Sequence, residues 1–409
     1  MDKLIKAQYT EYYVELREIK GLRWPRPQEI IEISKRRNLT SNELLALLSR
    51  TFYPPIWLLE LNIGKNENNK RRPITDFYNV LRFIDTIEDA RPEILSIETK
   101  RNLIDSFVRV IEKVQRRNKS ESIEDLVSNE LTTITNTLKP GVMNQYEEAF
   151  VEHFRRGGVL RSMKKNASDL ERRAIYMCTS SMAIGMKDFL GKKIDTIERL
   201  REYCDYVAGY VGTALTEIVD CSDGVQLNDK EARMFGRALQ IVNVLKDPKD
   251  DYEKRRVVYL PEELLGGLSH EELFNPDSVS GKQIRRAALN TMISHARDSL
   301  RQSMDYVSSI PERLTGYRGF TMIPLFAAIE TLNRMKREGA EAVFNGKKEA
   351  IKMGEGTGYN LGRFVYSILK FEDGKRTDKF LELYKKSLSE DPERYSFEPG
   401  KFEEWTKDF

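Results

Sequence analysis

The sequence predicts a single all-α domain, and three observations support this. Alternating strand patterns are nearly absent, and RRVVYLP (255–261) is the only piece that looks extended. Most of the 14 prolines and 24 glycines fall between helical stretches, with no internal repeat and no low-complexity linker. Apolar residues also recur at the three- and four-residue spacing of amphipathic helices, through residues 77–87, 122–137, 192–219, 231–245 and 285–305.

Turn-forming segments separate these predicted helices. They are GKNENNKRRP (64–73), KPG (139–141) and LLGGLSHEELFNPDS (264–278). From about residue 371 the chain turns polar and charged, which indicates a peripheral helix with a loose tail rather than a second domain. We therefore expect one all-α domain over residues 1–370 and a C-terminal helix and tail over residues 371–409.

The composition argues against several classes of protein. Of the 409 residues, 40% are apolar, which is enough for a sizeable core. The 67 basic and 64 acidic residues leave a net charge of +3, too little for a dedicated nucleic-acid binder. The three cysteines form no CxxC pair, so we expect a reducing compartment, with neither a disulfide scaffold nor a thiolate zinc site. The three histidines match no metal-binding spacing.

Membrane-spanning character is also absent from the sequence pattern. The N-terminus lacks the apolar stretch of a signal peptide, and no window approaches the ~18 uninterrupted apolar residues of a span. The last residues, YSFEPGKFEEWTKDF, cannot cross a bilayer. We therefore expect a soluble, cytoplasmic protein that contacts membranes only peripherally. Clusters such as Arg155–Arg156 and Lys164–Lys165 fit solvated faces, or attraction to anionic lipid headgroups.

The segment DFYNVLRFIDTIEDARP (76–92) carries the first chemical motif. Read as a helix, it turns its apolar side chains toward a core and places on another face Tyr78, Arg82, Asp85 and Asp89, with Glu88 beside them. Two carboxylates four residues apart repel each other, and a divalent cation such as Mg²⁺ would remove that cost. Acid pairs at this spacing also arise by chance on solvated helix faces. The spacing alone therefore does not decide between a metal site and a solvated acidic face.

A second acidic cluster strengthens the metal interpretation. In ALQIVNVLKDPKDDYEKRRVVYLP (238–261), Asp247 and Asp251 are four apart and precede the basic run Lys254–Arg256. Two acidic clusters, each beside basic residues, suit a diphosphate held with Mg²⁺ between facing helices. The alternative is a charged helix end that runs into a solvated loop. Because Pro248 disfavours helical geometry in the residue before it, we expect the second cluster to bend or leave the helix early.

These segments resemble the squalene/phytoene synthase family of trans-isoprenyl head-to-head synthases. FYNVLRFIDTIEDA is similar to the first aspartate-rich motif of that family, and LQIVNVLKDPKDD followed by VVYLPEEL is similar to the second. Four further segments resemble signatures of the same family, namely SRTF (49–52), MAIGMKDFL (182–190), YCDYVAGYVGTAL (203–215) and GFTMIPLFAAIETL (319–332). The last of these segments is more typical of the squalene branch of the family. The resemblance runs from about residue 45 to 365. It implies an isoprenoid-synthase helical bundle whose central cavity is polar at the mouth and apolar below.

The resemblance implies a two-step reaction. One farnesyl diphosphate ionises and is attacked by a second, giving presqualene diphosphate, which then ionises, rearranges and accepts hydride from NADPH to give squalene. The implied cofactors are Mg²⁺ and NADPH, and we expect a monomer that binds no nucleic acid. A rival activity stops before reduction, at dehydrosqualene, phytoene or presqualene diphosphate. An inactive scaffold relative is a weaker alternative, because both acidic clusters are present.

Residue roles are implied in the same way. The resemblance implies that Mg²⁺ is bound by Asp85, Glu88, Asp89, Asp247 and Asp251. It implies that the catalytic residues are Tyr203 and Tyr78, which act near the carbocation, together with Asp85 and Asp247. Diphosphate contacts fall to Ser49, Arg50, Arg82, Gln240, Asn243 and Lys246, of which Lys246 stands where relatives commonly carry arginine. The prenyl pocket falls to Phe52, Ala208, Gly209, Phe320 and Pro324, and NADPH binding to Asn243, Lys347, Lys348 and Lys352. Core packing explains the tyrosines and the pocket residues equally well, and small residues such as Gly209 and Gly212 also let helices approach closely.

Overall fold

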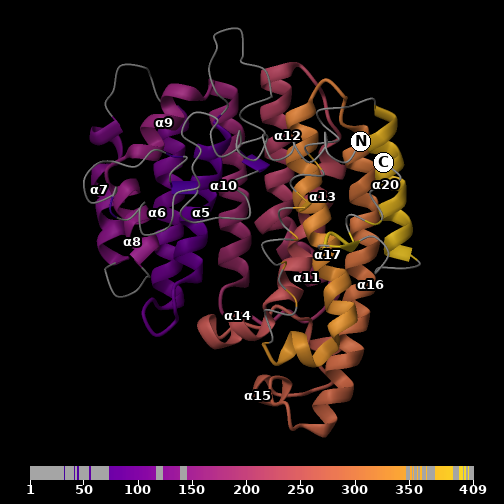
Figure 1. The fold of residues 1–409 in the computed structure, drawn as a ribbon. Helices are drawn as coiled ribbons and strands as arrows, with labels where there is room; N and C mark the ends of the chain where they lie inside the picture. The colour runs from indigo at the N-terminus through magenta and orange to yellow at the C-terminus, as the bar shows by residue number, and fades with distance from the viewer. Residues whose placement is uncertain are drawn as a thin grey trace.

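The computed structural model describes residues 73–116, 123–138, 145–346 and 374–389, together with single residues toward both ends of the chain. Over these ranges the chain is helical and contains no strand, which confirms the all-α prediction. Most helices run side by side along the long axis of the molecule (Figure 1). None of the described helices combines the length and the apolar composition needed to cross a bilayer.

The first half of the described chain forms one group of helices, on the left in Figure 1. The group consists of α5 (Ile74–Asp89), α6 (Ile97–Arg116), α7 (Ile123–Thr137), α8 (Gln145–Arg155), α9 (Gly158–Asn166) and α10 (Asp169–Phe189). Its core is aromatic. The ring of Phe83 on α5 lies 4.7 Å from that of Phe107 on α6 and 4.3 Å from that of Phe154 on α8. This packing fixes the face of α5 that remains available to a site.

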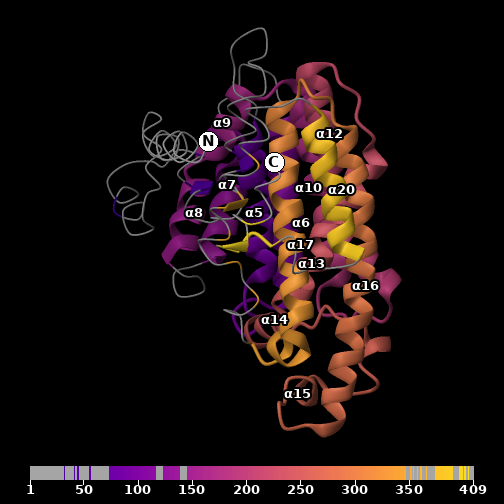
Figure 2. The same ribbon diagram turned by 45° about the vertical axis from the view of Figure 1, so that its right-hand side comes forward.

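The second half forms the other group, which comes forward in Figure 2. It consists of α11 (Ile197–Cys204), the π-helix η1 (Asp205–Gly209), α12 (Tyr210–Asp223), α13 (Asp229–Lys246), α14 (Pro248–Arg255), η2 (Glu262–Leu264), α15 (His270–Leu273), α16 (Val279–Ser309), α17 (Thr315–Phe344) and α20 (Gly374–Ser389). Helix α13 packs between α12, α16 and α17. It is therefore the central helix of this group.

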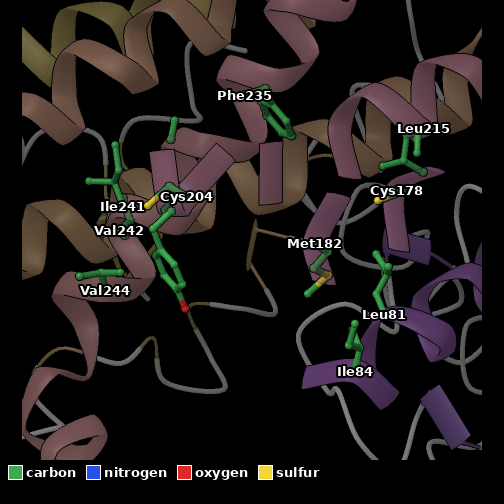
Figure 3. Packing of buried hydrophobic residues seen from close by; sticks show 14 of the residues in the cluster. Leu81, Ile84, Cys178, Met182, Cys204, Leu215, Phe235, Ile241, Val242 and Val244 are labelled. Carbon is green, nitrogen blue, oxygen red and sulfur yellow. The ribbon is translucent and has the colours of Figure 1, made fainter. Parts of the chain in front are cut away.

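Helix α10 joins the two groups. It packs against α5 and α6 on one side and against η1 and α12 on the other. Figure 3 shows Leu81 and Ile84 of α5 near Met182 of α10, and Cys178 of α10 beside Leu215 of α12. All five side chains are buried. One apolar core therefore runs through both groups.

Glycines allow α13 to approach its neighbours closely. A Cβ atom on Gly212 would lie 2.1 Å from the carbonyl oxygen of Ala232, and one on Gly236 would lie 2.2 Å from the carbonyl oxygen of Ala208. Real Cβ atoms do not come so near to backbone atoms, so neither position accepts a side chain without a shift of the helices.

The structure refines several sequence expectations. The stretch 192–219 becomes helical only at Ile197 and then continues without a break through α11, the π-helix η1 and α12. The predicted turn at 264–278 contains the short helix α15. The extended piece at 255–261 pairs with no strand in the described chain. The predicted C-terminal helix corresponds to α20, and Phe397 in the tail expected to be loose is fully buried. The predicted turn at 139–141 lies outside the described residues.

Candidate active site

The first acidic motif occupies the last two turns of α5. Arg82 Nη1 lies 4.0 Å from Asp85 Oδ2 and 3.7 Å from Asp89 Oδ2, so one guanidinium stands between two carboxylates. These side chains are partly exposed, and so are Tyr78 and Glu88, whereas the apolar positions of the same helix are buried. The face predicted from the sequence spacing is thus confirmed.

Burial and mutual repulsion act on the carboxylates of this motif. Burial is the largest cause that raises the pKa of Asp85 to about 7, with the Asp89 charge adding to it and Arg82 opposing it. Burial also raises the pKa of Glu88 to about 8, and the charges of Asp89 and Asp85 add to the effect. A carboxylate cluster that resists ionisation in this way is stabilised by any cation placed among its oxygens.

The second acidic motif lies where one helix ends and another begins. Helix α13 ends at Lys246, and Asp247 has φ −129° and ψ 35°, outside the helical region. Pro248 is the first residue of α14, where its fixed φ and missing N–H are tolerated. The expected early departure from the helix is therefore confirmed, and its cause is the proline.

The break directs α14 toward α5, so that the two motifs meet. Arg255, in the last turn of α14, places Nη1 3.2 Å from Asp251 Oδ1 and Nη2 2.7 Å from Asp89 Oδ2. Burial raises the pKa of Asp251 to about 6, and the charges of Asp89 and Asp247 contribute in the same direction. The carboxylates of both motifs thus lie within electrostatic reach of one another.

A row of polar side chains leads along α13 to the second motif. Asn243 Nδ2 donates to Gln240 Oε1 at 3.4 Å, and Lys246 Nζ donates to Asn243 Oδ1 at 3.1 Å. Lys246 Nζ also lies 3.3 Å from Asp247 Oδ2. The residues predicted to contact a diphosphate on this helix therefore share one face.

Tyr203 lies at the C-terminal end of α11 and is 4% exposed. Its ring stacks on that of Tyr259 at 4.8 Å and meets the edge of Phe189 at 5.3 Å. Burial raises the pKa of Tyr203 well above its ordinary value, and the charge of Glu88 adds to this. The phenol is therefore neutral at ordinary pH and lies within reach of the first motif.

The π-helix η1 follows Tyr203 directly and is anchored to α13. Asp205, which is buried, accepts two hydrogen bonds of 2.8 Å from Arg237 and lies 3.4 Å from Arg233 Nη2. A Cβ on Gly209 would lie 2.7 Å from Asp205 Oδ1, so this glycine faces the anchored region. Ala208 lies in η1 beside Gly209, and α17 contains the buried residues Phe320 and Pro324. The assignment of Ala208, Gly209, Phe320 and Pro324 to a prenyl pocket stays a prediction.

The sequence pattern assigns no role to two residues of the site. Arg255 was part of a basic run, and Tyr259 belonged to the extended piece after the second motif. Both follow Asp251 within eight positions, which is the only indication that the sequence offers. Six predicted site residues lie outside the described chain, namely Ser49, Arg50, Phe52, Lys347, Lys348 and Lys352.

The carboxylates fit Mg²⁺ by chemistry, though not in their present pairing. Carboxylate oxygens are the ligands that Mg²⁺ prefers, and Asp247 Oδ1 is buried without a hydrogen-bond partner in the described structure. Within the described ranges no three acidic, histidine or cysteine groups converge on one point, whereas Mg²⁺ is commonly held by one or two carboxylates together with phosphate oxygens. Asp89 and Asp251 are instead engaged by Arg255. Arg255 thus already neutralises part of the charge that these two carboxylates would offer to a metal ion.

Two squalene synthases are similar to this chain over about seven tenths of its length. Squalene synthase of Dictyostelium discoideum is 27% identical over 303 residues, which cover 71% of this chain and 62% of that protein. Squalene synthase of Rattus norvegicus is 26% identical over 309 residues, which cover 72% of this chain and 64% of that protein. The chain thus spans less than two thirds of these relatives.

Solved structures show the same fold. The structure of TcSQS with the ligand E5700 has a TM-score of 0.62 and 20% identity, over 89% of this chain and 99% of that chain. The squalene/phytoene synthase family matches residues 49–354, most of the chain and both acidic motifs. On this match the chain belongs to the squalene/phytoene synthase family.

Proposed function

We propose that this protein is a squalene synthase, which condenses two farnesyl diphosphates head to head through presqualene diphosphate and reduces the product with NADPH. One observation carries the proposal most directly. The acidic motifs of α5 and α14 face each other, linked through Arg255 to Asp89 and Asp251, with Tyr203 beside them. The squalene synthases among its relatives support the choice of reaction.

The polar residues of the site deal with the leaving diphosphate. Asp85, Glu88, Asp89, Asp247 and Asp251 would hold Mg²⁺, which supplies positive charge to the departing group. Arg82 offers a planar fork to the diphosphate oxygens, while Lys246 offers a mobile point charge beside the amide of Asn243. Together these residues lower the cost of breaking the C–O bond, because they neutralise the charge that develops on oxygen.

Tyr203 and its neighbours act on the other fragment, the allylic cation. The neutral ring of Tyr203 presents a π-face that stabilises a nearby cation by ~0.5–2 kcal/mol. The ring is held by its stacking on Tyr259 and by the edge contact with Phe189. The apolar surroundings keep water away from the cation, which would otherwise be captured as an alcohol.

Product analysis tests this proposal. The purified chain is incubated with farnesyl diphosphate and MgCl₂, with and without NADPH, and the extracted lipids are identified by mass spectrometry. We expect squalene when NADPH is present, and presqualene diphosphate or dehydrosqualene-type products when it is omitted. A product that is indifferent to NADPH assigns the protein to the non-reducing synthases. The absence of any head-to-head product under both conditions rejects the proposal.

A further inference from the structure

Arg255 stands at the point where the two acidic motifs meet. Its Nη2 lies 2.7 Å from Asp89 Oδ2 on α5, and its Nη1 lies 3.2 Å from Asp251 Oδ1 on its own helix. The arginine side chain is 33% exposed, whereas those of Asp89 and Asp251 are 19% and 16% exposed. One guanidinium therefore bridges carboxylates from both motifs in a largely shielded setting.

Without Arg255, the negative charges of Asp89 and Asp251 would have too few positive charges near them. Asp89 has a second basic neighbour, Arg82, but at the longer distance of 3.7 Å. Asp251 experiences the like charges of Asp89 and Asp247, against which Arg255 is the strongest opposing charge. Removing Arg255 would leave the carboxylates of α5 and α14 to repel each other, with only Arg82 and Lys246 nearby to oppose that repulsion.

A divalent cation between the motifs and this guanidinium would use the same two carboxylates, of which Arg255 engages one oxygen each. Mg²⁺ held between the motifs takes oxygens from Asp89 and Asp251, the two residues that Arg255 occupies. The two cations repel each other at this short range and therefore compete for the same carboxylates.

We propose that Arg255 is an internal counter-cation that holds the two acidic motifs together in the metal-free protein, and that Mg²⁺ displaces it from Asp89 and Asp251. The inference rests on the proposed function only in taking the two motifs as metal ligands. Arg255 is thus a positioning residue. It sets the metal affinity of the site, because each binding event must first break its two ion pairs.

Thermal unfolding with Mg²⁺ alone as the probe tests this competition. Arg255→Gln should lower the melting temperature of the metal-free protein by about 3 °C, because the carboxylates lose their counter-charge. Saturating Mg²⁺ should restore most of that loss, so the Mg²⁺-induced increase is larger in the variant than in the wild type. The apparent dissociation constant for Mg²⁺ should fall about fivefold. Lys254→Gln is the matched control, since Lys254 pairs with Asp250 at the exposed side of the same turn.

An equal or smaller Mg²⁺-induced increase in Arg255→Gln overturns the inference. If that variant does not fold, Arg255→Lys asks the same question, because a point charge bridges two carboxylates less well than a planar fork. The measurement uses no prenyl substrate and is therefore independent of the product assay. Squalene formation with an unchanged Mg²⁺ response rejects the counter-cation alone. A larger Mg²⁺ response in a chain that makes no prenyl product rejects the proposed function alone.

Discussion

At the scale of single residues, the acidic motif of α5 carries the sharpest expectation for activity. Asp85→Asn or Asp89→Asn keeps the size of the side chain but removes the charge that a metal needs. We expect product formation to fall about 10²-fold or more while the fold survives. The change is measured as product formed at saturating MgCl₂, beside circular dichroism to verify folding.

Asp105→Asn serves as the control for this pair. Asp105 lies on the next helix, α6, where its half-exposed side chain pairs with Lys187 of α10 rather than with either motif. Its replacement should leave product formation unchanged. Near wild-type turnover by Asp85→Asn would contradict the assignment of Asp85 as a metal ligand.

The same residues predict how metal binding depends on pH. The pKa values of Asp85, Asp251 and Glu88 are raised to about 7, 6 and 8 in the metal-free protein. A folded-state pKa above the unfolded value means that the folded protein holds more protons, so these groups cost stability as pH rises from about 4 to 8. Because Mg²⁺ binds the ionised form, its stabilising effect should increase over the upper part of this range.

Melting temperatures at pH 6, 7 and 8, each with and without MgCl₂, measure this dependence. We expect the Mg²⁺-induced increase to be largest at pH 8. In Glu88→Gln, which cannot ionise at this position, the increase should vary less with pH. A response to Mg²⁺ that is constant from pH 6 to 8 in the wild type would show that these carboxylates are not the ligands.

The sequence allowed the acidic residues to be predicted but not their bridge. Asp85, Asp89 and Asp251 are recognisable from local spacing, because four residues make about one helical turn. Arg255 and Tyr259 acquire their roles only when α14 folds back toward α5 and when the extended piece reaches Tyr203. Those contacts depend on tertiary placement, which local spacing does not encode.

At the scale of helices, the close packing of α13 against η1 makes its own prediction. Gly236→Ala would place a Cβ 2.2 Å from the carbonyl oxygen of Ala208, a backbone atom that cannot move without shifting η1. We expect a loss of about 3 kcal/mol in the free energy of unfolding. Denaturant unfolding measures this loss.

Gly224→Ala is an informative comparison for Gly236→Ala. Gly224 has no neighbour near its would-be Cβ, but it ends α12 with φ +60°. Its replacement should cost only the backbone strain of about 1 kcal/mol. Equal losses in the two variants would show that the helix contact at Gly236 does not determine the larger effect.

The end of α13 is predictable from the sequence, whereas the π-helix η1 is not. Pro248 marks the end of α13 because its effect on the preceding residue is local. The π-helix η1 has no such marker. It is accompanied by the pairing of Asp205 with Arg237 on α13, a partner from a different helix. Apolar periodicity therefore predicts helix through 192–219 but does not show the π turn within it.

At the scale of the whole molecule, the candidate site joins the two groups of helices. The first motif belongs to α5 in one group and the second to α14 in the other, while α10 holds the groups together through the core. A ligand that binds both motifs must therefore restrain segments that are distant in sequence. If one ligand restrains α5 and α14 together, the two acidic motifs form one shared site rather than two separate clusters.

Hydrogen exchange measures that coupling directly. We expect Mg²⁺ with inorganic diphosphate to slow amide exchange both at the end of α5 and in α14, because one bound cluster closes the gap between their carboxylates. Asp89→Asn should remove the protection in α14 as well as in α5, although the substitution lies only in α5. Asp105→Asn should preserve both effects. If Asp89→Asn abolishes protection in α5 while α14 remains protected, the two motifs bind ligands independently, and a single site shared between the helix groups is excluded.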